Sequence, residues 1–250
     1  NMCFNNHEYL ILQIGRLDLN IKNNIKFKYN SNSYESPLSS IAIKNIFKDK
    51  IKATLLYPVS LPLNSIFKDK NTDDFFKKIN EILTDSNKKE DYLKNPKELF
   101  KDHPHSKLVD SFFCLHSIGL YEGVNFQANV QDITLYILAI LIKECMENKF
   151  NYKKIYIDIS SGLNIYITAL LEALRYFQTW EKFFNLSNSS LEFCVVYTDP
   201  IIGSGNNEYN IYEYETNVKV FFSSPISYED LNNGLPKRVI EEALKESKEM

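Results

Sequence analysis

Apolar residues in this chain fall into two kinds of run, and their spacing predicts which segments form strands and which form helices. Short alternating or continuous apolar runs, typical of strands, occupy residues 9–14, 51–57, 111–117, 154–159 and 192–197. Longer runs with helical spacing occupy residues 38–47, 73–83, 131–148 and 164–184. Because the strand segments are too hydrophobic to have one face in water, the alternation predicts an α/β fold. We expect a mostly parallel sheet with helices on both faces.

Two regions depart from this alternation. Residues 20–33 are polar apart from a short alternating piece at 25–29, which predicts an edge strand. Residues 84–105 are rich in lysine and poor in apolar residues. They predict a polar insertion with at most one short helix, near residues 96–101.

The last fifty residues show a different pattern of apolar and charged positions. Residues 209–214 and 218–222 alternate on either side of a polar turn, which predicts an antiparallel hairpin. A charged helix opens at Pro236 and reaches the last residue without a stop signal, so we expect the natural protein to continue. These features predict one domain over residues 1–225, followed by a linker and the start of a helix over residues 226–250.

The segment at residues 158–164, with sequence DISSGLN, is the most informative junction between a strand and a helix. It places two hydroxyls, a glycine and an amide between a buried strand and a long helix: Ser160, Ser161, Gly162 and Asn164. The free N–H groups of a first helical turn, together with the helix dipole, favour a phosphate or another anion. An ordinary helix cap is the simpler interpretation of one such turn. The combination on a central strand favours a ligand cradle.

Other strand ends carry weaker signals. Gly15 and Arg16 follow the first strand, and Arg16 could pair with an anion or be a plain surface charge. Ser36 and Pro37 start a helix on whose first turn Ser39 is compatible with ligand contact. The loop that holds Gly119 could face a ligand or be a simple turn.

Composition and charge exclude several classes of function. The chain is 44% hydrophobic with a formal net charge of −3, so it has no global basic field for duplex DNA. The longest apolar run, residues 136–142, is too short to cross a bilayer. The N-terminal residues lack the apolar core of a secretory signal. We therefore expect a cytoplasmic protein with no membrane partner, and the widely spaced cysteines are expected to be buried free thiols.

Common catalytic motifs are not found in the sequence. There is no GxSxG elbow, no GxxxxGK[ST] phosphate loop, no GxGxxG turn and no HExxH pair. His103 and His105 fall in the polar insertion, and His116 is expected to be a core residue. We expect no metal site and no resident cofactor.

The junctions taken together resemble a known family. Four segments carry the resemblance in the expected order: residues 36–42, 55–62, 158–164 and 195–200. They are similar to the CRISPR-associated Rossmann-fold (CARF) sensor domains in ancillary ribonucleases of type III CRISPR systems, of the Csx/Csm type. The resemblance covers residues 9–225 and implies a Rossmann-like sheet. Many relatives have a histidine where Ser161 stands.

The resemblance also implies a ligand, a partner and a site. The ligand is a cyclic oligoadenylate second messenger, with cyclic tetra-adenylate favoured and cyclic hexa-adenylate as the alternative, held on the two-fold axis of a homodimer. Contacts would come from residues after the first and fourth strands, namely Gly15, Arg16, Ser160, Ser161, Gly162 and Asn164. Ser39 and Gly119 are further candidates from the other strand ends.

Whether the chain is an enzyme stays open at this stage. HEPN ribonuclease domains, which follow such sensors, need an arginine and a histidine four to six residues apart, and no arginine here has one. The first hypothesis is therefore a sensor that controls an effector domain beyond this sequence. The second is a metal-independent ring nuclease, in which a ribose 2′-hydroxyl attacks its own phosphate and Ser160, Ser161 or Arg16 assists. A transcription regulator whose DNA-binding part lies outside this sequence is a third hypothesis. It is the least favoured, because Glu241, Glu242, Glu246 and Glu249 of the final helix would repel DNA phosphate.

Overall fold

The computed structural model describes residues 7–18, 24–70, 73–184, 191–200 and 208–216. Most of the strands join one sheet: β1 (Tyr9–Ile14), β2 (Ile25–Tyr29), β3 (Asn32–Ser36), β4 (Ile51–Pro58), β5 (Ser111–Leu115), β8 (Lys154–Asp158), β9 (Glu192–Thr198) and β10 (Tyr209–Glu215). A separate hairpin contains β6 (Ile118–Tyr121) and β7 (Val124–Gln127). The helices are α1 (Ser39–Phe47), α2 (Asp74–Thr84), α3 (Ser86–Lys94), α4 (Pro96–Lys101), α5 (Val130–Glu147) and α6 (Asn164–Phe184), with 3-10 turns η1 (Lys48–Lys50), η2 (Ser65–Phe67) and η3 (Pro104–Leu108).

The sheet has eight strands in the order β3-β2-β10-β9-β8-β1-β4-β5. The five strands from β9 to β5 are all parallel to their neighbours, whereas β10 pairs antiparallel with β9. The α/β fold with a mainly parallel sheet is therefore confirmed. All five regular strands of the prediction are present, with ends that differ by at most two residues.

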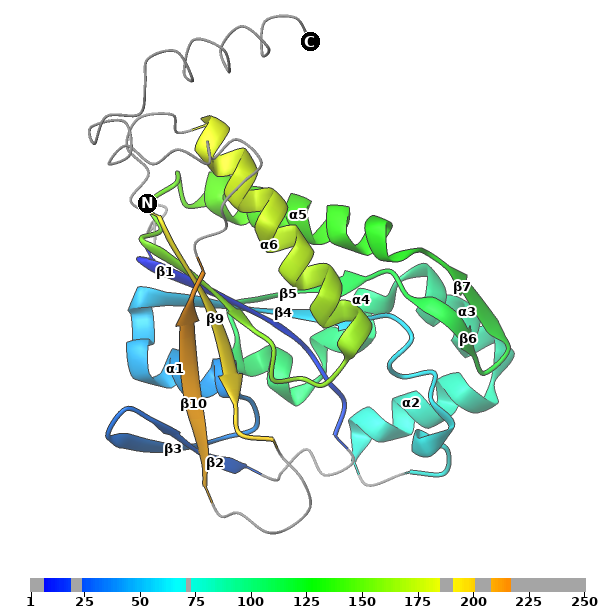
Figure 1. Cartoon of the computed structure of the whole chain (residues 1–250). Helices are drawn as coiled ribbons and strands as arrows, with labels where there is room; N and C mark the ends of the chain where they lie inside the picture. Colours follow the sequence, from blue (N-terminus) through cyan, green and yellow to red (C-terminus); the bar gives the residue numbers. More distant parts are fainter. Residues whose placement is uncertain (1–6, 19–23, 71–72, 185–190, 201–207, 217–250) are drawn as a thin grey trace, which may run out of the picture. The chain divides into compact units, whose positions relative to one another are not determined.

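Helices cover both faces of the sheet (Figure 1). On one face, Leu10 and Leu12 of β1 pack with α5 and α6 in a single apolar cluster. On the other face, Ile11 packs with Ala42 and Ile43 of α1. Successive strand residues point to opposite faces, so a strand covered on both sides must be apolar throughout. That is why β1 is a continuous apolar run.

The segment 84–105 is only partly as predicted: the short helix expected near residues 96–101 is present as α4, but a second helix, α3, precedes it. Residues 84–105 form α3 and α4, and three apolar side chains anchor them: Tyr92, Leu99 and Phe100 are all buried. A few well-spaced apolar residues are enough to fix short charged helices to a core. His103 and His105 are buried too, contrary to their placement in a polar segment. His116, expected in the core, is instead exposed, with its ring 5.5 Å from that of Tyr136.

Three further predictions need correction or lie outside the described residues. Ser36 does not cap α1: its hydroxyl donates to the Leu38 carbonyl, and the helix begins at Ser39. Strand β2 is not the edge, because β3 pairs with its outer side. β10 is a strand as predicted but pairs with β9 and β2; its predicted hairpin partner at 218–222 and the helix from 236 lie outside the described residues.

The cysteine prediction holds for the part of the chain that the structure describes. Cys145 and Cys194 are buried free thiols, and Cys114 is a free thiol that is partly buried. Within the described ranges, no helix combines the length and the apolar character needed to span a membrane.

Candidate functional site

The carboxyl ends of β1 and β8 lie side by side at the point where the chain reverses its direction of winding. From β1 the chain continues to β4 and β5 on one side, then returns to β8 and β9 on the other. α1 packs on one face of the sheet and α6 on the opposite face. In open α/β sheets, the crevice at such a switch point is where ligands bind. The fold therefore places the predicted junction at 158–164 in the expected ligand position.

A buried hydrogen-bond network ties this crevice together from three elements. The Ser39 hydroxyl, at the start of α1, donates to Asp158 Oδ2 at 2.6 Å and accepts from Gln13 Nε2 at 3.1 Å. The Ser40 hydroxyl donates to the other end of Gln13, at Oε1. Gln13 and Asp158 point to the α1 face because they alternate with the residues that face α6. The network fixes the end of β8 against β1 and α1.

Asp158 also shapes the loop that follows it. Its Oδ1 accepts the Ser160 backbone N–H at 2.9 Å, which holds the first turn of the loop. Burial raises the pKa of the Asp158 carboxyl, and the hydrogen bonds from Ser39 and the Ser160 backbone oppose that rise. Asp158 is fully buried and both of its carboxylate oxygens already accept hydrogen bonds, so its role is to hold the loop.

The loop ends in hydroxyl groups with unused hydrogen-bonding capacity. The side-chain oxygens of Ser160, Ser161 and Tyr166 are buried, and none makes a hydrogen bond of good geometry in the part of the chain that is described, although the Ser160 side chain lies close enough to Asp158 to oppose the rise in the pKa of its carboxyl. Gly162 lies between them with φ of +74° and no atom within 4 Å of where a Cβ would be. Buried hydroxyls normally find partners. Three unsatisfied hydroxyls within seven residues of chain, two of them just before a glycine that faces open space, are therefore the feature to test for a ligand.

The end of β1 differs, because its groups already have partners. The Arg16 guanidinium donates to Asp18 Oδ2 at 2.8 Å and to the Pro37 carbonyl at 3.3 Å. Gly15 is buried, and the Tyr57 ring would lie 2.3 Å from a Cβ at that position. Packing against Tyr57 is thus a sufficient reason for glycine here, independent of any ligand.

Beneath the β1 end lies a buried pair of histidines. The His103 and His105 rings are 4.6 Å apart, and His103 Nδ1 is 3.1 Å from the Tyr57 hydroxyl. Both ring nitrogens of His105 lack a partner among the described residues. Burial lowers the pKa of His103 to about 2 and that of His105 to about 4. Both imidazoles are therefore neutral at neutral pH.

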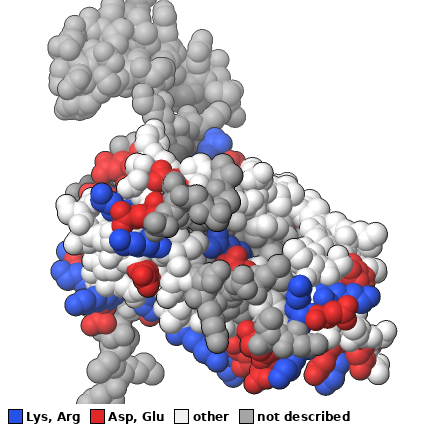
Figure 2. Space-filling view, turned by 90° about the horizontal axis from the view of Figure 1, so that it is seen from below, with Lys and Arg blue, Asp and Glu red and all other residues white. Residues whose placement is uncertain are grey.

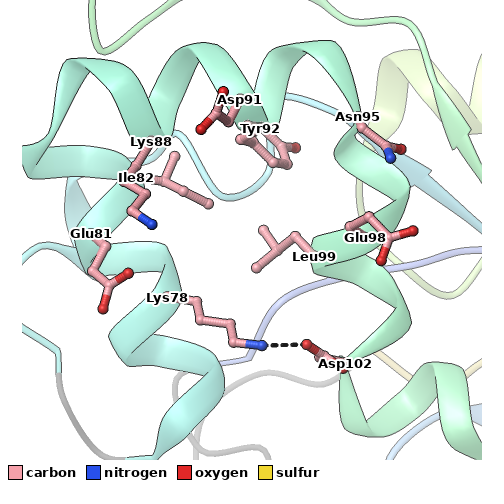
Figure 3. A pocket seen from close by; sticks show the side chains of 10 residues that line it. All are labelled: Lys78, Glu81, Ile82, Lys88, Asp91, Tyr92, Asn95, Glu98, Leu99 and Asp102. Atoms are coloured by element: carbon pink, nitrogen blue, oxygen red, sulfur yellow. Dashed lines mark hydrogen bonds and ion pairs between the residues drawn. The ribbon is translucent and has the colours of Figure 1, made fainter.

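Two surface pockets lie away from this crevice. One, of about 430 Å³, is formed by α2, α3 and α4, with the Lys78–Asp102 ion pair across it (Figure 3). The other, of about 350 Å³, lies at the end of β5 beside His116 and Gln127. Neither contains a residue of the segment 158–164.

Charge on the face seen from below is mixed. In its described part, Lys and Arg side chains alternate with Asp and Glu, with uncharged surface between them (Figure 2). The described residues contain no group of three or more His, Cys, Asp or Glu side chains arranged to hold a metal.

Comparison with protein families gives a match over most of the chain. The CARF domain of the CRISPR system endoribonuclease Csx1 matches residues 9–200. The chain belongs to this CARF family. The match starts at the first residue of β1 and ends two residues after β9, so it contains all five parallel strands and the switch point. No curated protein matches the chain.

The CARF fold gathers some of the predicted site residues and separates others. Arg16, Ser39, Ser160 and Ser161 all lie on elements that meet at the ends of β1 and β8. Ser39 is only 1% exposed, and its hydroxyl is hydrogen-bonded to Asp158 and Gln13. Gly119 lies in β6, beyond the edge strand β5, which is three places from β8 in the sheet.

Three residues of this CARF crevice could not be singled out from the sequence. Gln13 is the centre of the buried network, Asp18 neutralises Arg16, and Tyr166 adds the third unsatisfied hydroxyl. Only Tyr166 gave a usable signal, since it occupies the first turn of the helix that follows the DISSGLN segment.

Proposed function

We propose that this CARF domain is a sensor of cyclic oligoadenylate, with cyclic tetra-adenylate as the favoured ring and cyclic hexa-adenylate as the alternative. Membership of the Csx1 CARF family supports the class of function. A phosphate of the ring binds at the β8–α6 junction, against Ser160, Ser161 and the N–H groups that open α6.

The observation that carries this proposal is the cluster of unsatisfied hydroxyls. A buried polar group without a partner costs about 1–3 kcal/mol. The hydroxyls of Ser160, Ser161 and Tyr166 all lack one among the described residues, and a phosphate oxygen can accept from each hydroxyl it reaches. Anions are also favoured at a helix N-terminus. The open space at Gly162 lets a ligand approach the backbone closely.

The proposal also includes a second copy of the chain as partner and an effector domain that ligand binding controls. The ring would lie on the two-fold axis of a homodimer, so that each copy supplies one β8–α6 junction. Residues 226–250 would lead to an effector domain, and ligand binding at the crevice would control it. A strict monomer at micromolar concentration, with and without ligand, would contradict the shared site.

Ring cleavage is the alternative outcome for the same site. The 2′-hydroxyl of a ribose would attack the neighbouring phosphorus, form a 2′,3′-cyclic phosphate and release the 5′-oxygen, which takes up the proton. Such a step needs orientation and a cation more than a protein nucleophile. Arg16 is the nearby cation, but Asp18 already pairs with it. We therefore favour binding over cleavage.

The deciding experiment measures binding and product together. Purified chain is incubated with cyclic tetra-adenylate or cyclic hexa-adenylate in the presence of a chelator; binding is followed by calorimetry and product by chromatography. We expect tight binding to one ring, which stays intact over hours. Linear product would establish the nuclease instead, and no binding to either ring would contradict both functions.

A further inference from the structure

Tyr197 and Tyr212 form a stacked pair of exposed rings at the carboxyl end of β9. They face each other in the register of β9 and β10. Their ring centroids are 5.3 Å apart with an interplanar angle of 22°, and each residue is 41% exposed. Tyr197 falls in the segment 195–200 that carries the resemblance, but the sequence assigned no role to either tyrosine, and none of the interactions described above uses them.

The pair lies next to the proposed phosphate site. The Ile159 N–H, at the start of the site loop, donates to the Val196 carbonyl at 2.9 Å, and Tyr197 is the next residue. Val195 packs in the cluster that contains α5 and α6. Because strand residues alternate, Tyr197 points to this same face, as does Tyr212 opposite it. The loop from β8 to α6 crosses to the same face, so the rings and the loop are neighbours.

Asp199 holds the Tyr212 ring in place, and Tyr197 stacks on that ring. The Tyr212 hydroxyl donates to Asp199 Oδ1 at 2.9 Å. Asp199 Oδ2 accepts the backbone N–H and the side-chain amide of Asn210, each at 2.8 Å. The backbone hydrogen bond from Asn210 contributes most to lowering the pKa of the Asp199 carboxyl. A charged carboxylate at this end disfavours a phosphate but tolerates a neutral base.

We propose that Tyr197 and Tyr212 are a stacking surface for an adenine base of the ligand. This inference rests on the proposed function, since it assumes that a phosphate of the same nucleotide chain occupies the β8–α6 junction. Bases stack on aromatic side chains in single-stranded nucleic acid sites, and every base offers a flat face for it. Two preoriented rings beside a cluster of hydroxyl donors supply both parts of a nucleotide site.

Calorimetry with cyclic tetra-adenylate and cyclic hexa-adenylate on single variants tests the surface. We expect Tyr197→Ala and Tyr212→Ala each to weaken binding about 5- to 100-fold, the usual effect of losing one stacked ring. Tyr212→Phe keeps the ring and loses only the bond to Asp199, so its affinity should stay within about 3-fold. Tyr176→Ala is the matched control: Tyr176 is equally exposed, at 40%, but lies about 18 Å along α6 from Asn164.

The outcomes separate this inference from the proposed function. If the wild-type chain binds a ring and both alanine variants bind equally well, the stacking surface is wrong and the proposed function stands. If the wild-type chain binds neither ring, both are wrong. If Tyr176→Ala weakens binding as much as Tyr197→Ala, the effect is not stacking, and the surface is again wrong. Should an alanine variant fail to fold, Tyr197→Leu and Tyr212→Leu remove the aromatic face while keeping apolar bulk.

Discussion

The two strand ends that meet at the switch point differ in how much hydrogen-bonding capacity they leave unused. At the end of β8, Ser160 and Ser161 have buried hydroxyls without partners in the described chain, and Gly162 faces open space. At the end of β1, Arg16 is paired with Asp18 and Gly15 is packed against Tyr57. The sequence presents both ends as a glycine beside polar residues. We therefore propose that the end of β8 binds the ligand and that the end of β1 serves as framework.

The largest effect is expected from the two glycines. In Gly15→Ala the new methyl group meets the Tyr57 ring, which cannot move freely because it stacks on Phe100 at 4.5 Å. We expect a loss of about 3 kcal/mol in the free energy of unfolding. Gly162→Ala meets no atom and carries only the strain of a positive φ, about 1 kcal/mol.

Denaturant unfolding of both glycine variants, with calorimetric binding of the rings, measures the contrast. Gly162→Ala should lose more affinity than Gly15→Ala once the folded fraction is taken into account. Equal losses of stability, or a larger binding defect in Gly15→Ala, would contradict the assignment of framework and site.

The acidic residues of the two ends provide the next contrast. Asp158→Ala leaves the Ser39 hydroxyl and the Ser160 N–H without their buried acceptor, so we expect a loss of about 2 kcal/mol in the free energy of unfolding. Asp18→Ala removes a partly exposed ion pair, which is worth less than about 1 kcal/mol. Chemical unfolding at neutral pH distinguishes the two. A stable Asp158→Ala variant would show that the buried network does not hold the loop.

A pH effect should come from the histidines under the end of β1. Their pKa values are lower in the folded chain than the usual 6.5, so the unfolded chain binds more protons in mild acid. The stability due to neutral burial is complete above pH 6.5 and is lost as the pH falls towards 4, by roughly 1 kcal/mol per pH unit for each histidine.

The variant His105→Leu tests that pH effect, because the His105 nitrogens have no described partner to lose. Thermal unfolding between pH 7 and pH 4.5 should show a shallower decline than in the wild-type chain. If thermal stability falls with pH as steeply in His105→Leu as in the wild-type chain, burial of neutral His105 does not contribute to the acid sensitivity, which would contradict the prediction.

The smallest effect is expected from freeing Arg16. Asp18→Ala leaves the guanidinium with the Pro37 carbonyl and no counter-ion. If the ligand phosphate passes near Arg16, affinity should rise about 2- to 5-fold at low salt and less at high salt. Titrations at two salt concentrations measure this rise. A fall in affinity would mean that Asp18 itself contacts the ligand.

The parallel strands and the helices between them could be predicted because their apolar residues follow local, periodic patterns. Continuous apolar runs require a sheet covered on both faces, and the DISSGLN segment marks one strand end clearly. The failures have long-range causes. Tyr92, Leu99 and Phe100 anchor α3 and α4 through contacts with distant residues, so the lysine-rich segment forms two helices where composition predicted at most one. The same contacts bury His103 and His105.

The position of the candidate site could be predicted from the sequence. Which of its polar groups have hydrogen-bond partners could not. Ser160 and Ser161 could be named as candidates from the turn chemistry alone. Whether a polar group is satisfied depends on residues far along the chain: Ser39 meets Asp158 across 119 positions, and Arg16 meets the Pro37 carbonyl across 21. Tyr197 and Tyr212 become neighbours only through the β9–β10 register. Pairings of this kind leave no signal in a single sequence.

The central claim is that the β8–α6 junction binds the ligand, and Ser161→Trp tests it most directly. The indole is meant to block the open space recorded at Gly162, and Ser161 itself makes none of the hydrogen bonds of the buried network of Gln13, Ser39 and Asp158. Calorimetry with cyclic tetra-adenylate and cyclic hexa-adenylate, alongside a thermal unfolding scan, compares the variant with the wild-type chain. We expect affinity to fall by at least about 100-fold, more than 2.7 kcal/mol, while the unfolding midpoint stays unchanged. Wild-type affinity in a folded Ser161→Trp variant would place the ligand elsewhere and contradict the claim.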